Sequence, residues 1–251
     1  SPDYFQSVPR ALTLGTPGGY NWGMHKIAGV LGGMGPDATV DFMAKVIAAT
    51  PAETDQDHVR LLVDQNPGVP SRQAALLGNG EDPGPTLAAM AAGLEQAGAD
   101  FLVMPCNTAH AFAAAIRDAV SIPLVSIIDV TVEACRDHGT VGLVSTAGCL
   151  EANLYQDALV AAGKTLVLPD ADEVAEMSRL VFEIKHGNRS DDVALRMQQT
   201  ANALVGRGAE VIVAACTEIP LVLTPDMLPV PLVSSTDVLA EVTAARCAGV
   251  A

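Results

Sequence analysis

Positively charged side chains are scarce in this sequence. Its 251 residues include 14 Lys and Arg against 29 Asp and Glu, so the formal net charge is −15 at pH 7. Proteins that bind nucleic acids need Lys and Arg to neutralise phosphates, and this composition therefore argues against a nucleic-acid partner. An acidic chain also repels anionic small molecules, so an acidic ligand would need specific cations at its binding site.

Long apolar runs and paired cysteine motifs are also missing. No stretch reaches the roughly 18–20 uncharged residues that a membrane span requires, because Glu95 and Asp100 interrupt the most apolar region, 86–104. There is no secretory signal with a basic segment and an apolar core. The five cysteines are odd in number and form no Cys-x-x-Cys, which favours reduced thiols. We therefore expect a cytoplasmic protein with no membrane partner.

The first 25 residues differ in character from the rest. Tyr4-Phe-Gln-Ser7 resembles the end of a protease-cleavable tag, and Met24 would then be the natural start. The alternative is a genuine N-terminal extension. We expect residues 1–25 to be an extension or a tag remnant rather than part of a folded domain.

Two cysteines occupy matching positions in two similar halves of the chain. Residues 98–106 read Gly-Ala-Asp-Phe-Leu-Val-Met-Pro-Cys, and residues 208–216 read Gly-Ala-Glu-Val-Ile-Val-Ala-Ala-Cys. Both segments begin with Gly-Ala and an acidic residue, continue as an apolar run and end at a cysteine, Cys106 or Cys216. Each cysteine is followed by polar side chains.

Two further segments recur in the same order. The apolar strand and Gly-rich turn of residues 26–37 have a counterpart in residues 140–148, and residues 122–129 have one in residues 230–237. The offsets between the halves stay close to 110 residues. Anchors that repeat in order at a nearly constant offset indicate a duplicated unit.

Each unit alternates short apolar runs with helical patterns. The runs 61–63, 101–104, 141–144 and 211–214 have the character of buried strands, and residues 85–98, 108–120 and 173–185 carry apolar residues at helical spacing. This alternation predicts an α/β fold with mostly parallel sheets covered on both faces.

We expect two pseudo-symmetric, flavodoxin-like domains separated by a cleft. The first would span residues 26–124, completed by a C-terminal helix over 236–251, and the second would span 125–235. Ligands of such sheets bind beyond the carboxyl ends of the strands. Cys106 and Cys216 both follow predicted strands, so the two domains would enclose one site between them.

A single cysteine is more often a small buried hydrophobe than a catalyst, and Cys135, Cys149 and Cys247 fit that description. Cys106 and Cys216 differ because they coincide in the repeat and precede polar groups. Cys106 also precedes a helical pattern whose first N–H groups would stabilise a thiolate. The pair predicts two acid/base groups facing one substrate.

Two other motifs near these positions carry weaker signals. Cys106 and His110 have the spacing of half a zinc site, but no second Cys/His cluster completes it. We therefore expect no metal, and His110 to be a helix residue with its ring nitrogens satisfied. Residues 32–35, Gly-Gly-Met-Gly, lack the dinucleotide and P-loop patterns. They predict a tight turn, or alternatively a turn that binds a carboxylate.

Two cations stand out against the acidic background. Arg72 follows a predicted strand, and Lys185 lies near the end of a predicted helix. Either side chain has an ordinary interpretation, as a solvated surface charge or as a lysine favoured by the helix dipole. Their positions alone do not decide between these interpretations and ligand binding.

Six motifs together resemble the aspartate/glutamate racemase family, and most closely its aspartate racemase branch. They are Leu31-Gly-Gly-Met-Gly-Pro, Asp57-His58, Asn66-Pro with Pro70-Ser-Arg72, Met104-Pro-Cys-Asn-Thr-Ala-His110, Lys185-His-Gly-Asn188 and Ala215-Cys-Thr-Glu-Ile-Pro-Leu221. The resemblance runs from about Lys26 to Arg246. Its two cysteine motifs are highly specific in combination.

The resemblance implies a racemase that needs neither pyridoxal phosphate nor any other cofactor, with its site between two α/β domains and often a homodimeric assembly. The substrate would be a small acidic amino acid, aspartate or glutamate. Carried over by motif, Cys106 and Cys216 would be the catalytic acid and base. The substrate-binding residues would be Met34, Arg72, Asn107, Thr108, Lys185, Thr217 and Glu218.

Alternatives stay open at this point. Cys149 stands where the family often has threonine, and a third thiol near the site bears on the substrate. The same scaffold is similar to that of maleate isomerases and of malonate decarboxylases, and a non-catalytic ligand-binding or sensor protein would retain the cleft. The presence of both thiols favours a racemase that acts in both directions. Aspartate, glutamate or a broader amino-acid substrate all remain open.

Overall fold

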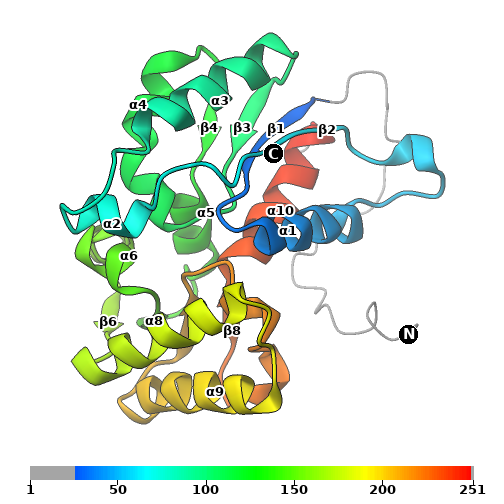
Figure 1. The fold of residues 1–251 in the computed structure, drawn as a ribbon. Coiled ribbons are helices and arrows are strands. Elements are labelled where there is room, and N and C mark those ends of the chain that lie inside the picture. The colour runs from blue at the N-terminus through cyan, green and yellow to red at the C-terminus, as the bar shows by residue number, and fades with distance from the viewer. Residues whose placement is uncertain (1–25, 250–251) are drawn as a thin grey trace.

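A computed structural model describes residues 26–249 of the chain (Figure 1). The predicted extension or tag remnant, residues 1–25, lies outside the described residues. Within the described part, none of the helices combines the length and the apolar character needed to traverse a membrane.

The first half of the described residues contains four strands and five α-helices. They are β1 (Ala28–Gly32), α1 (Pro36–Ala49), β2 (Leu61–Gln65), α2 (Arg72–Leu76), α3 (Gly84–Gln96), β3 (Phe101–Val103), α4 (Ala113–Ala119), β4 (Leu124–Val125) and α5 (Ile127–Ala134). The 3₁₀ turns η2 (Asp55–Asp57) and η3 (Thr108–Phe112) lie among them.

The second half repeats the scheme. Its elements are β5 (Thr140–Val144), α6 (Ala147–Glu151), α7 (Leu154–Ala161), β6 (Thr165–Val167), α8 (Ala171–Lys185), α9 (Asp191–Gly206), β7 (Val211–Ala214), β8 (Leu232–Ser234) and α10 (Ser235–Cys247). The 3₁₀ turns η4 (Ile219–Leu221) and η5 (Pro225–Met227) lie between β7 and β8.

The strands form two four-stranded sheets, with orders β2-β1-β3-β4 and β6-β5-β7-β8. All pairings are parallel, and helices cover the sheets (Figure 1). The predicted α/β class and its two flavodoxin-like sheets are confirmed. In each sheet the order reverses beside the first strand of that half, β1 or β5. Such a reversal is where ligands of doubly wound sheets bind.

One glycine in each central strand shows how closely the halves match. A Cβ added to Gly29 of β1 would lie 2.8 Å from Cδ2 of Leu102 on the neighbouring strand β3. A Cβ added to Gly142 of β5 would lie 2.7 Å from Cδ1 of Ile212 on β7. Both positions require glycine because a side chain on the neighbouring strand already fills the space. The duplication seen in sequence is therefore a duplication of packing.

The last helix returns to the first half of the molecule. Although α10 follows β8 directly, it packs against α1 and α5. Lys45 of α1 bridges Asp41 of its own helix at 2.7 Å and Asp237 of α10 at 3.0 Å. The exact domain boundaries stay a prediction.

The helix predicted over 108–120 begins as the 3₁₀ turn η3 and becomes α-helical only at α4. If an α-helix began at Cys106, the backbone N–H of His110 would donate to the carbonyl of Cys106, four residues earlier. Instead the His110 Nδ1–H donates to that carbonyl at 2.9 Å, while the His110 backbone N–H donates to Asn107 at 3.0 Å. A side-chain bond has displaced the α-helical one, and the turn tightens.

The same contacts settle the role of His110. Its Nε2 accepts the Ile127 N–H at 3.2 Å, so both ring nitrogens are satisfied and the ring is neutral. Burial, opposed only in part by the bond to Cys106, lowers the pKa of His110 to about 4. The prediction that both ring nitrogens of His110 have hydrogen-bond partners is confirmed.

Candidate active site

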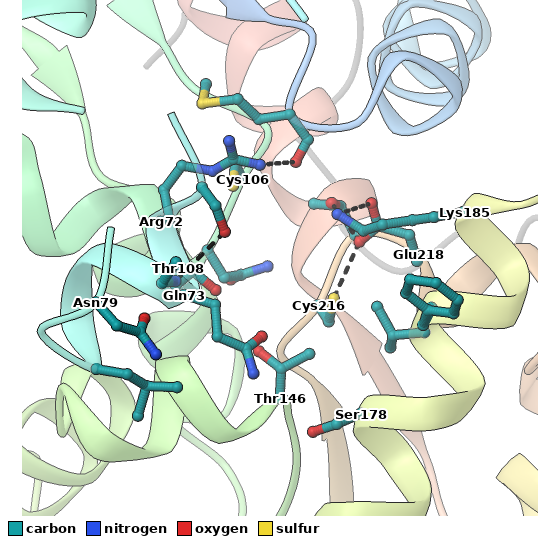
Figure 2. A pocket seen from close by; sticks show the side chains of 18 residues that line it. Arg72, Gln73, Asn79, Cys106, Thr108, Thr146, Ser178, Lys185, Cys216 and Glu218 are labelled. Atoms are coloured by element: carbon teal, nitrogen blue, oxygen red, sulfur yellow. Dashed lines mark hydrogen bonds and ion pairs between the residues drawn. The ribbon is translucent and has the colours of Figure 1, made fainter. Parts of the chain in front are cut away.

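A cavity of about 480 Å³ lies between the carboxyl ends of the two sheets. Figure 2 shows its walls, which come from both halves of the chain. All nine residues singled out from the sequence line it: Met34, Arg72, Cys106, Asn107, Thr108, Lys185, Cys216, Thr217 and Glu218. The structure therefore brings together segments that lie up to about 180 positions apart, while their individual roles stay predictions.

The topology of the sheets explains why these segments meet. Met34 follows β1 and Cys106 follows β3, the two strands that flank the reversal in the first sheet. Thr146 follows β5 and Cys216 follows β7, the equivalent strands in the second sheet. Each half thus contributes the loops at its own reversal point, and the cavity lies where ligands of such folds bind.

Cys216 belongs to a chain of three charged or ionisable groups. Its thiol donates to Oε2 of Glu218 at 3.0 Å, and Oε1 of the same carboxylate pairs with Nζ of Lys185 at 3.0 Å. Burial and the Glu218 charge raise the pKa of Cys216 well above the ordinary thiol value. We therefore expect Cys216 to hold its proton in the free protein and to act first as an acid.

Lys185 stays cationic in this setting. Burial opposes its charge, but attraction to Glu218 and to Cys216 and Cys106 outweighs burial and raises the pKa of Lys185. Lys185 and both cysteines line the same cavity (Figure 2). Lys185 is thus a fixed positive charge that either thiolate would feel.

Replacing Glu218 with glutamine is expected to lower the pKa of the Cys216 thiol. The substitution removes a neighbouring negative charge that raises this pKa and leaves Lys185 to favour the thiolate. The pH dependence of Cys216 alkylation, followed by mass spectrometry, measures the shift. Cys106 in the same sample is the internal control. An alkylation profile of Cys216 that stays in place or moves to higher pH would contradict the assigned contact.

Asn107 is held rigidly beside Cys106. Its Oδ1 accepts the Tyr155 hydroxyl at 2.6 Å, and its Nδ2 donates to Ser235 at 3.0 Å. Ser235 in turn donates to the carbonyl of Ala214 at the end of β7. This network links the two halves and uses one of the two amide N–H bonds of Asn107. The other amide N–H makes no hydrogen bond within residues 26–249 and is available to a ligand.

Arg72 is fixed by backbone carbonyls rather than by an acidic partner. Its Nη1 donates to Pro70 at 2.9 Å and to Val69 at 3.1 Å, and its Nη2 lies 3.5 Å from the carbonyl oxygen of Met34. Nη1 is therefore fully engaged. The edge formed by Nε and Nη2 retains donors for a carboxylate, which a guanidinium can bind in a bidentate manner.

The Gly-rich turn after β1 has fewer free backbone N–H donors for an anion than its sequence suggested. The Gly33 N–H donates to Oγ1 of Thr39 at 2.8 Å and is already satisfied. Gly33 itself has φ of 91°, and an added Cβ would lie 2.4 Å from the backbone of Asn66. The turn is therefore best described as a tight backbone packing site that presents Met34 to the cavity.

The two halves of the chain touch each other at two further places. Asp37, at the start of α1, pairs with Arg189 at 2.6 Å, and Arg189 lies in the turn that follows α8. Elsewhere, Gln73 of α2 packs on α6, where a Cβ added to Gly148 would lie 3.3 Å from Cγ of Gln73. These contacts join the two halves of the chain.

Three cysteines take no part in the cavity wall. Cys135, Cys149 and Cys247 are fully buried in an apolar core, and burial raises the pKa of each thiol, to about 11, 12 and 11 respectively. Cys149, where the family often has threonine, is therefore a core residue and not a third acid or base.

Five polar residues of the cavity wall were not singled out as site residues from the sequence. They are Ser71, Gln73, Asn79, Thr146 and Ser178. The repeat could have found Thr146, because it follows β5 as Met34 follows β1, and Gln73 is adjacent to Arg72. Ser178 lies in the middle of α8, where only the orientation of that helix in the fold reveals its position.

The site combines two thiols on opposite walls, a guanidinium with a free edge and an ammonium group (Figure 2). Such a set can bind a carboxylated ligand and move protons to and from it on two sides. Among residues 26–249, no three His, Cys, Asp or Glu side chains gather closely enough to hold a metal ion.

Known proteins resemble this chain along nearly its whole length. The model of the Asp/Glu/hydantoin racemase family matches residues 31–243. Broad specificity amino-acid racemase RacX of Bacillus subtilis is 28% identical over 220 residues, which are 86% of this chain and 95% of that protein.

Solved structures give the same picture. Picrophilus torridus aspartate racemase superposes with a TM-score of 0.77 and 29% identity, covering 89% of this chain and 94% of the other. An aspartate racemase homologue from Pyrococcus horikoshii has a TM-score of 0.72 and 25% identity, with coverages of 89% and 99%. The likeness includes both halves of the fold and hence both walls of the cavity.

Proposed function

The chain belongs to the Asp/Glu/hydantoin racemase family and is an isomerase, and from that premise we propose that it interconverts L- and D-aspartate, with glutamate as a second substrate. The reaction uses Cys106 and Cys216 as its two bases and requires no cofactor. The observation that carries this proposal is the pair of thiols at equivalent strand ends, with Arg72 and Lys185 in the same cavity.

Racemisation removes the α-proton from one face of the substrate and returns a proton to the other face. A single base would have to cross the substrate, whereas two bases on opposite walls need not move. In one direction the Cys106 thiolate takes the α-proton and the Cys216 thiol donates its own. The roles exchange for the other enantiomer. The raised pKa of Cys216 supports its role as the initial acid in the free enzyme.

Acid–base catalysis alone contributes roughly 10²–10⁴-fold, and the weakly acidic α-proton requires more. Negative charge grows on the α-carboxylate as the proton leaves, so donors fixed around it stabilise the transition state. Asn107, whose amide is held by Tyr155 and Ser235, supplies one such N–H. Thr108 supplies a hydroxyl group, and the Lys185 ammonium stabilises the charge from nearby. The Thr217 hydroxyl donates to Oε2 of Glu218 at 3.3 Å and would exchange that bond for one to the substrate.

Arg72 is the proposed partner of the side-chain carboxylate. The free Nε–Nη2 edge suits a bidentate grip, and the three carbonyls that hold the guanidinium reduce the entropy lost on binding. A local cation is needed because the chain as a whole carries a net charge of −15.

Exchange of the α-proton in D₂O, followed by NMR, tests the reaction itself. Reduced protein is incubated with L-aspartate or L-glutamate, without pyridoxal phosphate and with a chelator. We expect deuterium at Cα and the appearance of the D-enantiomer. Maleate is offered in parallel, because its isomerisation is the chemistry that the same pair of thiols would perform in a maleate isomerase.

The absence of exchange with either amino acid, from folded and reduced protein, would overturn the proposal. Binding without turnover would instead favour a sensor protein. The RacX relative is named a broad specificity racemase, so neutral amino acids belong in the same series. We also propose a homodimer, as the family resemblance implies, and sedimentation can test this assembly. The unpaired cysteine pattern favours a cytoplasmic location.

A further inference from the structure

The cavity is larger than aspartate requires. Its volume of about 480 Å³ equals about sixteen water-sized volumes of about 30 Å³, and aspartate has only about half as many non-hydrogen atoms. The cysteines, Arg72 and Lys185 account for one part of the wall. Space remains beside Gln73, Thr146 and Ser178, which Figure 2 shows below the level of Arg72 and Lys185.

Two contacts already join the halves of the chain in this structure. One is the Asp37–Arg189 ion pair of 2.6 Å. The other is the packing of α2 on α6. The space beside Gln73, Thr146 and Ser178 is therefore present while the halves are in contact.

The chemistry of this second compartment differs from that around Arg72. Its polar side chains, Gln73, Asn79, Thr146 and Ser178, are all neutral. Across residues 26–249, the side-chain amide of Gln73 and the hydroxyl of Thr146 make no hydrogen bond. Ser178 Oγ accepts from the Ala147 N–H at 3.4 Å, which leaves its own O–H free to donate.

A substrate group placed there meets both donors and acceptors but no cation. A carboxylate accepts hydrogen bonds only and would leave the acceptors in this wall unmatched, whereas a primary amide both donates and accepts. Gln73, Thr146 and Ser178 can together donate to and accept from an amide, whereas Arg72 only donates. Arg72 therefore suits a carboxylate, and the neutral wall suits an amide. Leu77 and Phe182, which are 54% and 62% exposed at the rim, provide apolar surface for the methylene groups that precede it.

We propose that Gln73, with Thr146 and Ser178, forms a second side-chain subsite that accepts a neutral primary amide, so that glutamine is racemised alongside the acidic substrates. The inference rests on the proposed racemase function. Arg72 and Gln73 are neighbours on α2, and the two side chains divide the substrates between them. An acidic side chain turns to Arg72, and an amide side chain turns to Gln73.

The test compares L-glutamine with L-aspartate in the wild-type protein and in Gln73→Ala. We expect wild-type exchange of both amino acids. In Gln73→Ala the kcat/KM for L-glutamine should fall about tenfold, as the loss of about one net hydrogen bond implies. The value for L-aspartate should stay within about twofold. Gln96→Ala, at the exposed end of α3 and outside the cavity, is the matched control.

Each outcome separates the subsite from the reaction. Exchange of aspartate but not glutamine overturns the subsite and leaves the racemase function standing. An equal loss with both amino acids in Gln73→Ala also overturns it. Exchange of glutamine but not aspartate supports the subsite and refutes the acidic substrate. If neither amino acid exchanges, the racemase function fails. Calorimetry then tests the subsite by itself. Binding of L-glutamine that Gln73→Ala weakens about tenfold supports the subsite, and binding that the substitution leaves unchanged overturns it.

Discussion

Replacing either Cys106 or Cys216 with alanine is expected to abolish racemisation. Each thiol serves one face of the substrate, so the loss of either removes the base for one enantiomer and the acid for the other. We expect a fall in kcat of at least about 10²–10⁴-fold, while circular dichroism and the melting temperature change little. Chiral chromatography of the products measures the loss. Full activity in either variant would exclude the two-thiol scheme.

The buried thiols of this chain provide the matched control. Cys149 lies within an apolar core and does not line the cavity. Cys149→Ala should therefore retain most of the activity, although the small void that it leaves lowers stability. An inactive but folded Cys149→Ala would mean that the acid and base have been misassigned.

Replacing Arg72 is expected to produce the second largest effect, and on binding rather than on the chemical step. Each hydrogen bond to a charged group contributes about 1.5–3 kcal/mol, so loss of the bidentate edge should raise KM for L-aspartate about 100-fold or more in Arg72→Leu. Arg72→Lys keeps the charge but cannot reproduce the fork of two donors. Its KM for L-aspartate should therefore lie between those of the wild-type protein and Arg72→Leu. Initial rates across substrate concentrations separate KM from kcat.

Arg72→Leu also leaves the carbonyls of Val69 and Pro70 without their donor. Thermal melting must therefore accompany the kinetics, to separate a displaced loop from lost substrate contacts. Arg136→Leu, at an exposed position 58% accessible to solvent, controls for the loss of one positive charge from an acidic protein. A normal KM in Arg72→Leu would remove Arg72 from the site.

Much of the fold could be predicted because the same sequence pattern occurs in both halves of the chain. Apolar runs ending in Cys106 and Cys216 predicted strand ends, and parallel sheets place strand ends at one edge. Gly29 and Gly142 recur because a single packing solution recurs. Local pattern and overall topology agree in both halves, which is why Cys106 and Cys216 could be expected around one cavity. The other seven predicted residues of its wall, Arg72 and Lys185 among them, were expected only from the family resemblance.

What the sequence could not supply are contacts made only by folding. The Asp37–Arg189 pair joins positions 152 apart, and no local signal links them. The 3₁₀ turn after Cys106 depends on a side-chain bond from His110 that the helical spacing does not reveal. Gln73 and Ser178 lie on helices whose rotation about their axes decides which residues face the cavity, and that rotation is set by packing.

The second residue after each cysteine differs between the halves, with thermodynamic consequences. The carboxylate of Glu218 accepts a hydrogen bond from the Cys216 thiol. Thr108, which carries no charge, occupies the matching place after Cys106. The two bases are therefore unequal, although the enantiomers that they serve have equal free energy in water. Because the equilibrium constant is unity, the Haldane relation forces kcat/KM to be identical for both enantiomers. The two thiols can therefore differ in effect only if kcat and KM change by the same factor between the enantiomers. The enzyme would then reach saturation at different concentrations of L- and D-substrate, although its kcat/KM is the same for both.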